Sequence, residues 1–207
     1  MEAQKAEPPK LLLFNRWDTT QVKVEDPGLR NYINLRPLLL PRTDGRYTHS
    51  QIDKHKAPIV ERFINKMMVP GHRGKKHKLS SDNAPASTQA IMIALKKAFG
   101  IIEQRTKQNP VQVMVKAIEN AALLEEIAAY RLGGIIARQA VVVTPHRRLD
   151  IALRHITQGI YAAKFKNRKP LEEVIADELM AGAAGDAQRS VGVRERQRIE
   201  KEAEGAR

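Results

Sequence analysis

Cysteine is absent from the 207 residues of this chain, which excludes both a disulfide framework and a thiolate metal site. Aromatic residues are also scarce, at 4% of the sequence, so aliphatic side chains must form most of any core. No apolar run approaches the ~20 residues that a membrane-spanning helix needs. The first ten residues are polar and contain two adjacent prolines, which is not a signal-peptide pattern. We therefore expect a cytosolic protein without a membrane segment.

Sequence patterns that carry catalysis are missing as well. The chain has no Gly-x-Ser-x-Gly elbow, no nucleotide-binding loop and no convergent pair of carboxylates, and without cysteine nothing fits an activated nucleophile. His72 and His77 could suggest a metal site, but no third ligand is near them in the sequence and their neighbours are cations. We therefore expect that the protein is not an enzyme and has no catalytic residues, no metal ion and no cofactor.

Positive charge is what the sequence has in excess. The chain contains 36 Lys and Arg against 23 Asp and Glu, a net charge of +13, which predicts a polyanionic partner. The excess is largest in the middle, where residues 71–150 carry 13 basic and 6 acidic side chains, against 12 and 8 in residues 1–70 and 11 and 9 in residues 151–207. A histone-like arm would carry its charge at one end, so we expect the basic surface to belong to the folded part.

Residues 1–50 are dense in proline and in other turn signals, too dense for long helices or strands. Short apolar pieces at 11–14 and 38–40 would let such a segment dock on a folded surface. We interpret Trp17 as an anchor in that docking, in preference to a platform for base stacking. This part of the chain is expected to form an extended N-terminal extension.

Residues 51–185 show the spacing of amphipathic helices. Apolar side chains recur three and four residues apart, as they do on one face of a helix. Asn109 followed by Pro110 is a typical helix start, an N-cap and a proline in the first turn. Residues 186–207 alternate in charge and are expected to form a solvated, charged C-terminal helix or tail. The helices are predicted at about 58–69, 87–106, 109–124, 144–166 and 170–184.

Between about residues 128 and 143 the helical spacing gives way to the pattern of a β-hairpin. The two runs flank Gly133 and Gly134, and a glycine pair supplies the positive φ angles that a tight turn needs. An isolated two-stranded hairpin is marginal in water, so this one should pack on the helices or on a partner. The alternative is that the preceding helix runs on through residues 125–131, which are rich in alanine.

The densest local positive charge lies in residues 71–78, which read Gly-His-Arg-Gly-Lys-Lys-His-Lys. Glycines let the backbone approach a chain of phosphates closely, while the cations neutralise it. The segment is not a Walker A loop, because the required spacing and the hydroxyl residue after lysine are absent. A flexible solvated turn is the alternative, and we favour contact with phosphate.

Arg147 and Arg148 fall in the first turn of the helix predicted at 144–166. Cations there oppose the helix dipole, so another interaction should favour them. A phosphate bound at the same helix N-terminus would do so, using backbone N–H groups and the arginine fork together. With Arg154 further along the helix and with residues 71–78, these arginines predict one continuous basic face that binds RNA.

Two other classes of function compete with a structural RNA-binding protein. A helix-turn-helix DNA regulator needs two helices joined by a short turn and a dimer seam, whereas the helices predicted here are separated by long basic or hairpin segments. An RNA-processing enzyme would show a turnover activity that survives purification. Binding selective for a duplex DNA sequence would favour the first of these, and such turnover the second.

The ordered combination of several short motifs is similar to that of one family. The motifs are Ala-Pro-Ile-Val-Glu-Arg-Phe-Ile-Asn-Lys-Met-Met at 57–68, the glycine and basic positions at 71–76, Asn-Pro-Val-Gln-Val at 109–113, Ala-Ile-Glu-Asn at 117–120, Gly-Gly-Ile at 133–135, Ala-Val at 140–141 and Pro145 with Arg147, Arg148 and Leu149. Over about residues 14–185 they resemble the universal small-subunit ribosomal protein family numbered seven in bacteria and five in eukaryotes. Leu-Phe at 13–14, Arg-Trp at 16–17 and Gly-Arg-Tyr at 45–47 look like the archaeal and eukaryotic branch, which carries an N-terminal extension.

This resemblance implies a mainly α fold, a single helical domain of about six helices with a protruding β-hairpin. It also implies a structural constituent of the small ribosomal subunit that binds the 3′ major, or head, domain of small-subunit rRNA and assists head assembly. The hairpin would lie near the exit-site tRNA and the mRNA path. The implied partners are this rRNA, neighbouring ribosomal proteins of the head and platform, tRNA and mRNA, on ribosomes in the cytoplasm.

Two sets of residues would then contact RNA, mostly through its shape and phosphates. Those on the hairpin, facing RNA or tRNA, are Arg131, Gly133, Gly134 and Arg138. Those that bind rRNA are Lys54, Lys56, Arg73, Lys75, Lys76, Lys78, Arg147, Arg148 and Arg154.

Overall fold

The computed structural model describes residues 11–47, 49–50, 52–69, 72–73, 76–77 and 87–206, and of residues 72–73, 76–77 and 132 it describes the backbone alone. The described residues form six α-helices, and no helix among them is long and apolar enough to span a membrane. The elements are η1 (Ile52–Lys56, a 3-10 helix), α1 (Ile59–Met67), β1 (His72–Arg73), β2 (Lys76–His77), α2 (Thr88–Thr106), α3 (Pro110–Ala121), β3 (Glu125–Leu132), β4 (Ile135–Val142), α4 (Pro145–Lys164), α5 (Leu171–Ala184) and α6 (Val191–Glu204).

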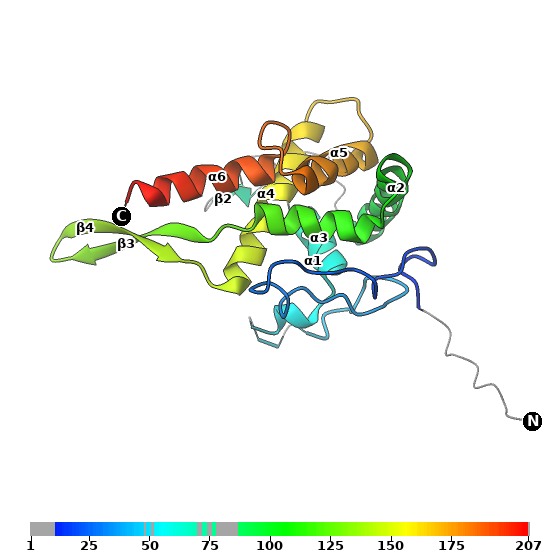
Figure 1. Ribbon diagram of the computed structural model, residues 1–207, viewed down its shortest axis with the longest axis horizontal. Helices are drawn as coiled ribbons and strands as arrows, with labels where there is room; N and C mark the ends of the chain where they lie inside the picture. Colours follow the sequence, from blue (N-terminus) through cyan, green and yellow to red (C-terminus); the bar gives the residue numbers. More distant parts are fainter. Residues whose placement is uncertain are drawn as a thin grey trace, which may run out of the picture.

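The helices pack around α3 and α4, and the hairpin β3–β4 projects away from them at one end (Figure 1). α5 packs on α2 and α3, while α4 contacts α1, α3, α5 and α6. α2 lies at the end opposite the hairpin, and α6 runs beside the hairpin's base. The predicted mainly α fold of about six helices with one protruding hairpin is confirmed.

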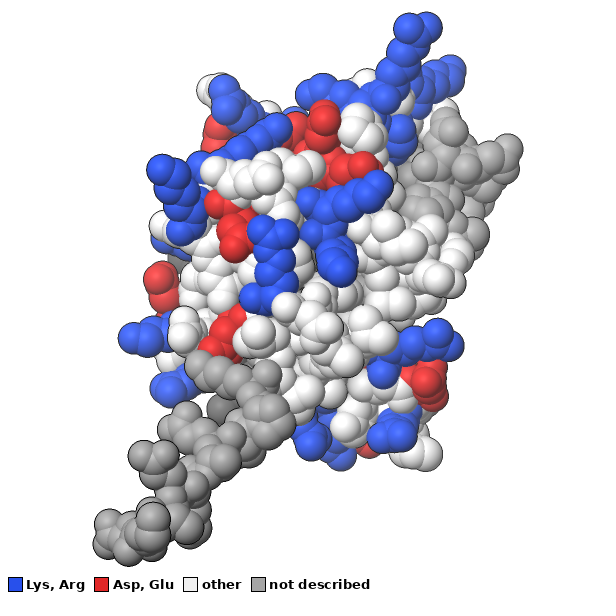
Figure 2. All heavy atoms as spheres, turned by 90° about the vertical axis from the view of Figure 1, so that its right-hand side faces the viewer, with Lys and Arg blue, Asp and Glu red and all other residues white. Residues whose placement is uncertain are grey.

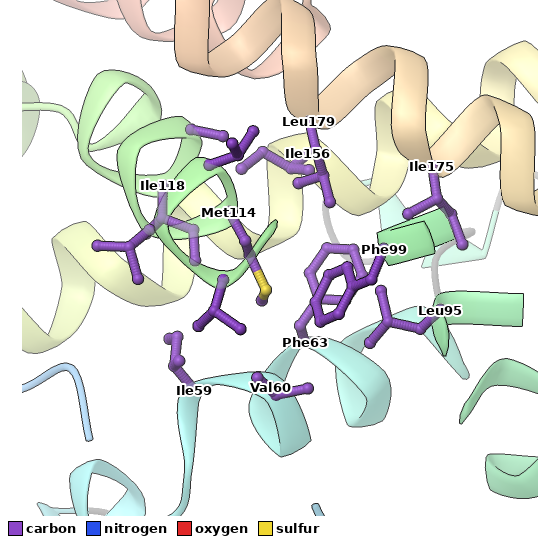
Figure 3. Close-up of a cluster of buried hydrophobic side chains, with 14 of the residues drawn as sticks. Ile59, Val60, Phe63, Leu95, Phe99, Met114, Ile118, Ile156, Ile175 and Leu179 are labelled. Atoms are coloured by element: carbon purple, nitrogen blue, oxygen red, sulfur yellow. The ribbon is translucent and has the colours of Figure 1, made fainter. Parts of the chain in front are cut away.

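Aliphatic side chains fill most of the core, as the shortage of aromatic residues predicts (Figure 3). Phe63 of α1 and Phe99 of α2 are both fully buried, and Met114 of α3 lies close to them. The remaining labelled side chains come from α1 to α5, so one shared core holds five helices together. They are Ile59, Val60, Leu95, Ile118, Ile156, Ile175 and Leu179.

Some of the helix starts carry side-chain caps, among them the one predicted at Asn109, whereas the side chain of Thr144 before α4 makes no cap hydrogen bond. The Asn109 side chain accepts a hydrogen bond from the backbone N–H of Val111 at 3.0 Å, and Pro110 occupies the first turn of α3. Such a cap satisfies an N–H group that has no partner within the helix. At α2 the side chain of Ser87 does the same for the N–H of Ala90.

The extension, in residues 11–47, packs several apolar side chains into the main core, whereas Leu39 and Leu40 of the predicted docking piece 38–40 stay exposed. Trp17 is 4% exposed, and its ring lies edge-on to those of Phe14 and Phe99, with centroids 6.2 and 5.5 Å away. Its indole N–H donates to the Glu103 carboxylate at 3.2 Å. The interpretation of Trp17 as a docking anchor is therefore confirmed, because a side chain so buried has no face left for a base.

The hairpin is longer than predicted and begins at Glu125, three residues before the predicted start. The alternative of a continued helix is wrong, since α3 ends at Ala121 and Ala122 already has an extended ψ of 112°. Leu123 just beyond is fully buried in a small second core with Val143, Ile151 and Ile199. Burial of this residue and pairing with β4 outweigh the helix propensity of the alanines.

The C-terminal segment differs from the solvated helix or tail expected for residues 186–207. α6 packs on α4 and beside β3, with Val193 and Ala203 buried. Gly192 permits this approach, because a Cβ added there would lie 2.9 Å from Ile156. The apolar stripe of α6 is narrow and lies among alternating charges, so the sequence pattern predicted a solvent-exposed helix. The structure instead has a helix interface here.

Candidate nucleic-acid interface

The two arginines at the start of α4 point in different directions. Arg147 is largely exposed and forms a bidentate ion pair with Glu126 of β3, one arm of which is 2.7 Å long. That hydrogen bond raises the pKa of Arg147 above its usual value. Arg147 therefore lies at the surface where α4 meets the base of the hairpin.

Arg148, by contrast, is 7% exposed and bonds within the protein. Its guanidinium donates to the carbonyl of Leu123 at 3.0 Å and to the carboxylate of Asp26 at 2.6 Å. The sequence analysis expected a bound phosphate to offset the unfavourable position of this cation at a helix N-terminus. The Leu123 carbonyl and the Asp26 carboxylate provide that favourable interaction instead. The sequence predicted that both arginines lie on one outer basic face. This is wrong for Arg148, whose side chain points inward and joins the extension to the base of the hairpin.

A cluster of cations from η1, α1 and α4 surrounds one carboxylate, that of Asp150. Arg62, only 8% exposed, donates to Asp150 at 2.8 Å, and the Nζ of Lys54 lies 3.9 Å from the other oxygen. Lys66 and Arg154 lie in the same electrostatic neighbourhood. We call these four cations and Asp150 the α1–α4 face.

Positive charge on the α1–α4 face exceeds what its carboxylate can neutralise. Burial, and then the Arg154 guanidinium, hold the pKa of Lys66 below its usual value. Among the described residues Lys66 and Arg154 form no ion pair, and the buried Nη1 of Arg62 has no hydrogen-bond partner. An arrangement of cations that repel one another and lack counter-charges can stabilise a bound polyanion, because the phosphates replace the missing carboxylates.

Three rings join the extension, η1 and α4 at the edge of this face. The ring of His146 lies 4.8 Å from that of Tyr32 and 5.5 Å from that of His55, measured between centroids. The Nε2 atom of His146 is buried without a hydrogen-bond partner among the described groups. Burial, and then the charge of Arg62, lower the pKa of His146. These contacts hold η1 and the start of α4 together, so that their cations share one surface.

A polar cavity of about 210 Å³ continues this basic surface toward the extension. Lys56 lies on its wall and also pairs with Asp53 at 2.7 Å, while Arg36 and Arg46 form no ion pair among the described residues. The carboxylate on its wall is that of Asp44, which pairs with Arg42. The wall is formed by Asn34, Arg36, Leu38, Arg42, Thr43, Asp44, Arg46, Tyr47, Lys56 and Pro58.

The structure describes the basic segment 71–78 only in part. Residues 72–73 and 76–77 form the two short antiparallel strands β1 and β2, in which His72 pairs with His77 and Arg73 with Lys76. Lys75 and Lys78, two of the predicted rRNA-binding residues, lie outside the described residues. The phosphate contacts of this segment stay a prediction.

The β3–β4 hairpin places its two predicted arginines on one face. Arg131 pairs with Ile136 and Arg138 with Ala129, and side chains two residues apart along a strand share a face. Gly133 and Gly134 form the turn with φ angles of +53° and +93°. Both arginines are exposed, so they can contact a partner that approaches this face.

The sequence reasoning missed Arg62 and Lys66 as members of the basic surface. They lie one helical turn apart in α1, within the motif at 57–68 that was used for the family resemblance and not for its charge. Two features of the sequence could have indicated a basic surface here. Arg62 and Lys66 lie four residues apart, as neighbours on one helix face do, and Lys54 and Lys56 lie just upstream. Arg36 and Arg46 carried no such signal, because only the path of the extension brings them to one cavity.

Comparison with known proteins gives consistent results over nearly the whole chain. The family model described as ribosomal protein S7p/S5e matches residues 29–207. The chain is similar to the small ribosomal subunit protein uS7 of Nanoarchaeum equitans, with 43% identity over 96% of this chain and 100% of the relative. Its identity to the uS7 proteins of Methanococcus aeolicus and Methanococcus vannielii is 40% and 38%, over 96% and 99% of this chain and 100% of each relative. The chain belongs to the ribosomal protein S7p/S5e family.

Proposed function

We propose that this protein is a structural, non-catalytic constituent of the small ribosomal subunit that binds the 3′ major domain of small-subunit rRNA and assists assembly of the head. The observation that carries the proposal is the α1–α4 face, where Arg62 and Lys54 pair with the single carboxylate of Asp150 and two further cations lie nearby without an ion pair among the described residues. Family membership supports a ribosomal role, and the cation cluster supports binding through phosphates. The proposed site of action is the ribosome in the cytoplasm.

In this proposal the rRNA backbone crosses η1, α1 and the start of α4. The phosphates would lie against Lys66 and Arg154, which form no ion pair among the described residues, and against the paired cations beside them. The exposed Arg147 would extend the contact toward the hairpin. Arg148 would position these elements and would not touch RNA, because its hydrogen bonds are internal. The proposed contacts are Lys54, Lys56, Arg62, Lys66, Arg73, Lys75, Lys76, Lys78, Arg147 and Arg154.

We further infer that the hairpin face with Arg131 and Arg138 approaches tRNA or mRNA near the exit site. The glycine turn leaves room at the tip, since a Cβ added at Gly133 or Gly134 would meet nothing within 4 Å. The hairpin projects beyond the helices, as an element that reaches a neighbouring molecule must (Figure 1). Neighbouring head and platform proteins would contact other parts of the surface.

Crosslinking of the full chain to RNA in cells, followed by sequencing of the attached RNA, tests the proposal. We expect reads clustered in the head domain of small-subunit rRNA, with a smaller set from tRNA or mRNA attached to hairpin residues. Reads spread evenly over cellular RNA, or clustered in another rRNA domain, would contradict it. Purified protein that turns over an RNA substrate would contradict the non-catalytic role.

A further inference from the structure

A groove with an apolar floor lies between α2 and the extension, next to the polar cavity with which it shares Arg42. Its volume is about 510 Å³. Ile93 of α2 is 52% exposed, and Leu39 and Leu40 of the extension are 43% and 55% exposed. The groove is lined by Phe14, Asn15, Leu39, Leu40, Arg42, Gln89, Met92, Ile93 and Lys96. We call it the α2 groove.

The α2 wall of this groove is a second helix face, separate from the one that enters the core. The core face of α2 carries Ile91, Leu95 and Phe99, all fully buried. Met92 and Ile93 lie on the other side with Gln89 and Lys96, three to four residues apart, as neighbours on one helix face do. Ile93 therefore contributes little to the core of this chain.

The extension builds the other wall through an unusual turn. Phe14 and Asn15 have φ angles of +55° and +61°, a conformation that bulky side chains rarely adopt. The N–H of Phe14 donates to the carbonyl of Leu39 at 2.9 Å, which fixes the turn against residues 38–40. The turn thus holds apolar side chains at the surface in a defined arrangement.

Exposed large apolar side chains gathered in one hollow mark an interaction site. RNA fits this hollow poorly, because its backbone needs cations, and of the residues that line it only Arg42 and Lys96 are cationic. Arg42 is already paired with Asp44 at 2.6 Å. The face that carries α2 also shows a broad uncharged area, with Asp and Glu among its Lys and Arg (Figure 2).

We propose that the α2 groove docks a short apolar peptide segment of another protein of the small subunit, with a carboxylate next to its apolar residues. The carboxylate is inferred from Lys96, which stands on the groove's wall and forms no ion pair among the described residues. This proposal rests on the proposed function, because it requires that the chain is part of the small ribosomal subunit. It assigns RNA to the α1–α4 face and a protein segment to the α2 groove.

A photo-reactive benzoylphenylalanine in place of Ile93 in the full chain, irradiated in assembled small subunits, tests the proposal. We expect a crosslink to one neighbouring protein, at a segment where mass spectrometry finds apolar residues beside Asp or Glu. A crosslink to rRNA, to a second copy of this chain or to this chain's own terminal residues would overturn the proposal, and so would no crosslink. Failure of the chain to enter small subunits would instead contradict the proposed function.

A matched pair of substitutions gives a second measurement. Ile93→Glu places a charge in the groove, while Gln104→Glu adds the same charge to an exposed position of α2 outside it. We expect Ile93→Glu to weaken retention of the crosslinked neighbour about tenfold, as a charge in an apolar contact does, and Gln104→Glu to leave it unchanged. Equal effects of the two variants, or loss of rRNA binding by Ile93→Glu, would speak against a protein contact here.

Discussion

The two sides of α4 carry charge in different ways. On one side, η1, α1 and α4 together contain eight basic and three acidic residues, and Arg62 and Lys54 both pair with Asp150. On the other side, α5 and α6 together contain four basic and eight acidic residues. There Arg198 bonds to Glu195 and Glu202 at 2.8 and 2.6 Å within α6.

These counts give the first side a net charge of +5 and the second a net charge of −4, although both contain several arginines. Both sides pair part of their cations internally, and what differs is the excess of cations over carboxylates. A paired surface cation gains little from a phosphate, since it must first give up its own partner. A polyanion therefore gains most at Lys66 and Arg154, which form no ion pair among the described residues, and the acidic side is left for other contacts.

The largest effect is expected on stability, when the two adjacent arginines at the start of α4 are substituted. One of them bonds inside the protein and the other lies at the surface. Arg148→Ala removes a buried cation and leaves Asp26 and the Leu123 carbonyl without it, so we expect a loss of about 3 kcal/mol in the free energy of unfolding. Arg147→Ala, at an exposed pair, should cost less than about 1 kcal/mol. Urea denaturation measures both. Equal losses would mean that the inward and outward arginines do not differ as the structure indicates.

Charge reversal should separate the two sides by their affinity for RNA. Lys54→Glu combined with Arg154→Glu should weaken binding to a head-domain rRNA fragment by at least about tenfold and lower the salt slope by about one unit for each lost phosphate contact. The matched control is Arg194→Glu with Lys201→Glu on α6, which makes the same charge change on the other side. Filter binding at several salt concentrations provides the measurement. If the α6 pair weakened binding as much, the comparison of the two sides would fail.

A smaller effect is expected from pH, which should change both the stability and the rRNA affinity through His146 and His155. Burial lowers the pKa of both in the folded protein, so the unfolded chain takes up protons first and stability should fall as the pH drops below about 6.5. A phosphate beside His146 would favour the charged form of its ring. The affinity for rRNA should therefore rise as the pH drops below about 6.5. We expect a change of at most about tenfold, the effect of one pKa unit.

Substitutions distinguish the two histidines. His146→Gln should flatten the pH dependence of rRNA affinity, because that ring lies near Arg62, Lys54, His55 and Asp150. His155 lies near Glu195, Arg154 and Arg198, so His155→Gln should flatten the pH dependence of stability and leave that of affinity unchanged. A pH dependence of affinity that survives His146→Gln would show that another group takes up the proton.

Local patterns in the sequence were sufficient for the helices and for the hairpin turn. Asn109 with Pro110 marked the start of α3, and Gly133 with Gly134 marked the turn, because caps and positive φ angles depend on neighbouring residues alone. The end of α3 was misplaced, since alanine-rich residues can join a helix or a strand. Packing of Leu123 decided between them.

The candidate site was predictable only in part. Clusters such as Arg147 with Arg148 showed that a basic surface exists near the start of α4, but neighbours in sequence ended with opposite environments. Asp26, which holds Arg148, is 122 residues away in the sequence, and no local pattern relates the two. The same holds for Arg62 and Asp150, which are 88 residues apart.

The sequence by itself determined the excess of positive charge, the helical spacing, the hairpin turn and the family resemblance. Only the tertiary structure decided which cations are neutralised and which remain available, and that α6 docks where solvent was expected. The physical reason is that an ion pair depends on the distance between side chains in space, whereas a cap or a turn depends on a few consecutive residues. The function of the basic surface therefore depends on contacts between distant segments of the chain.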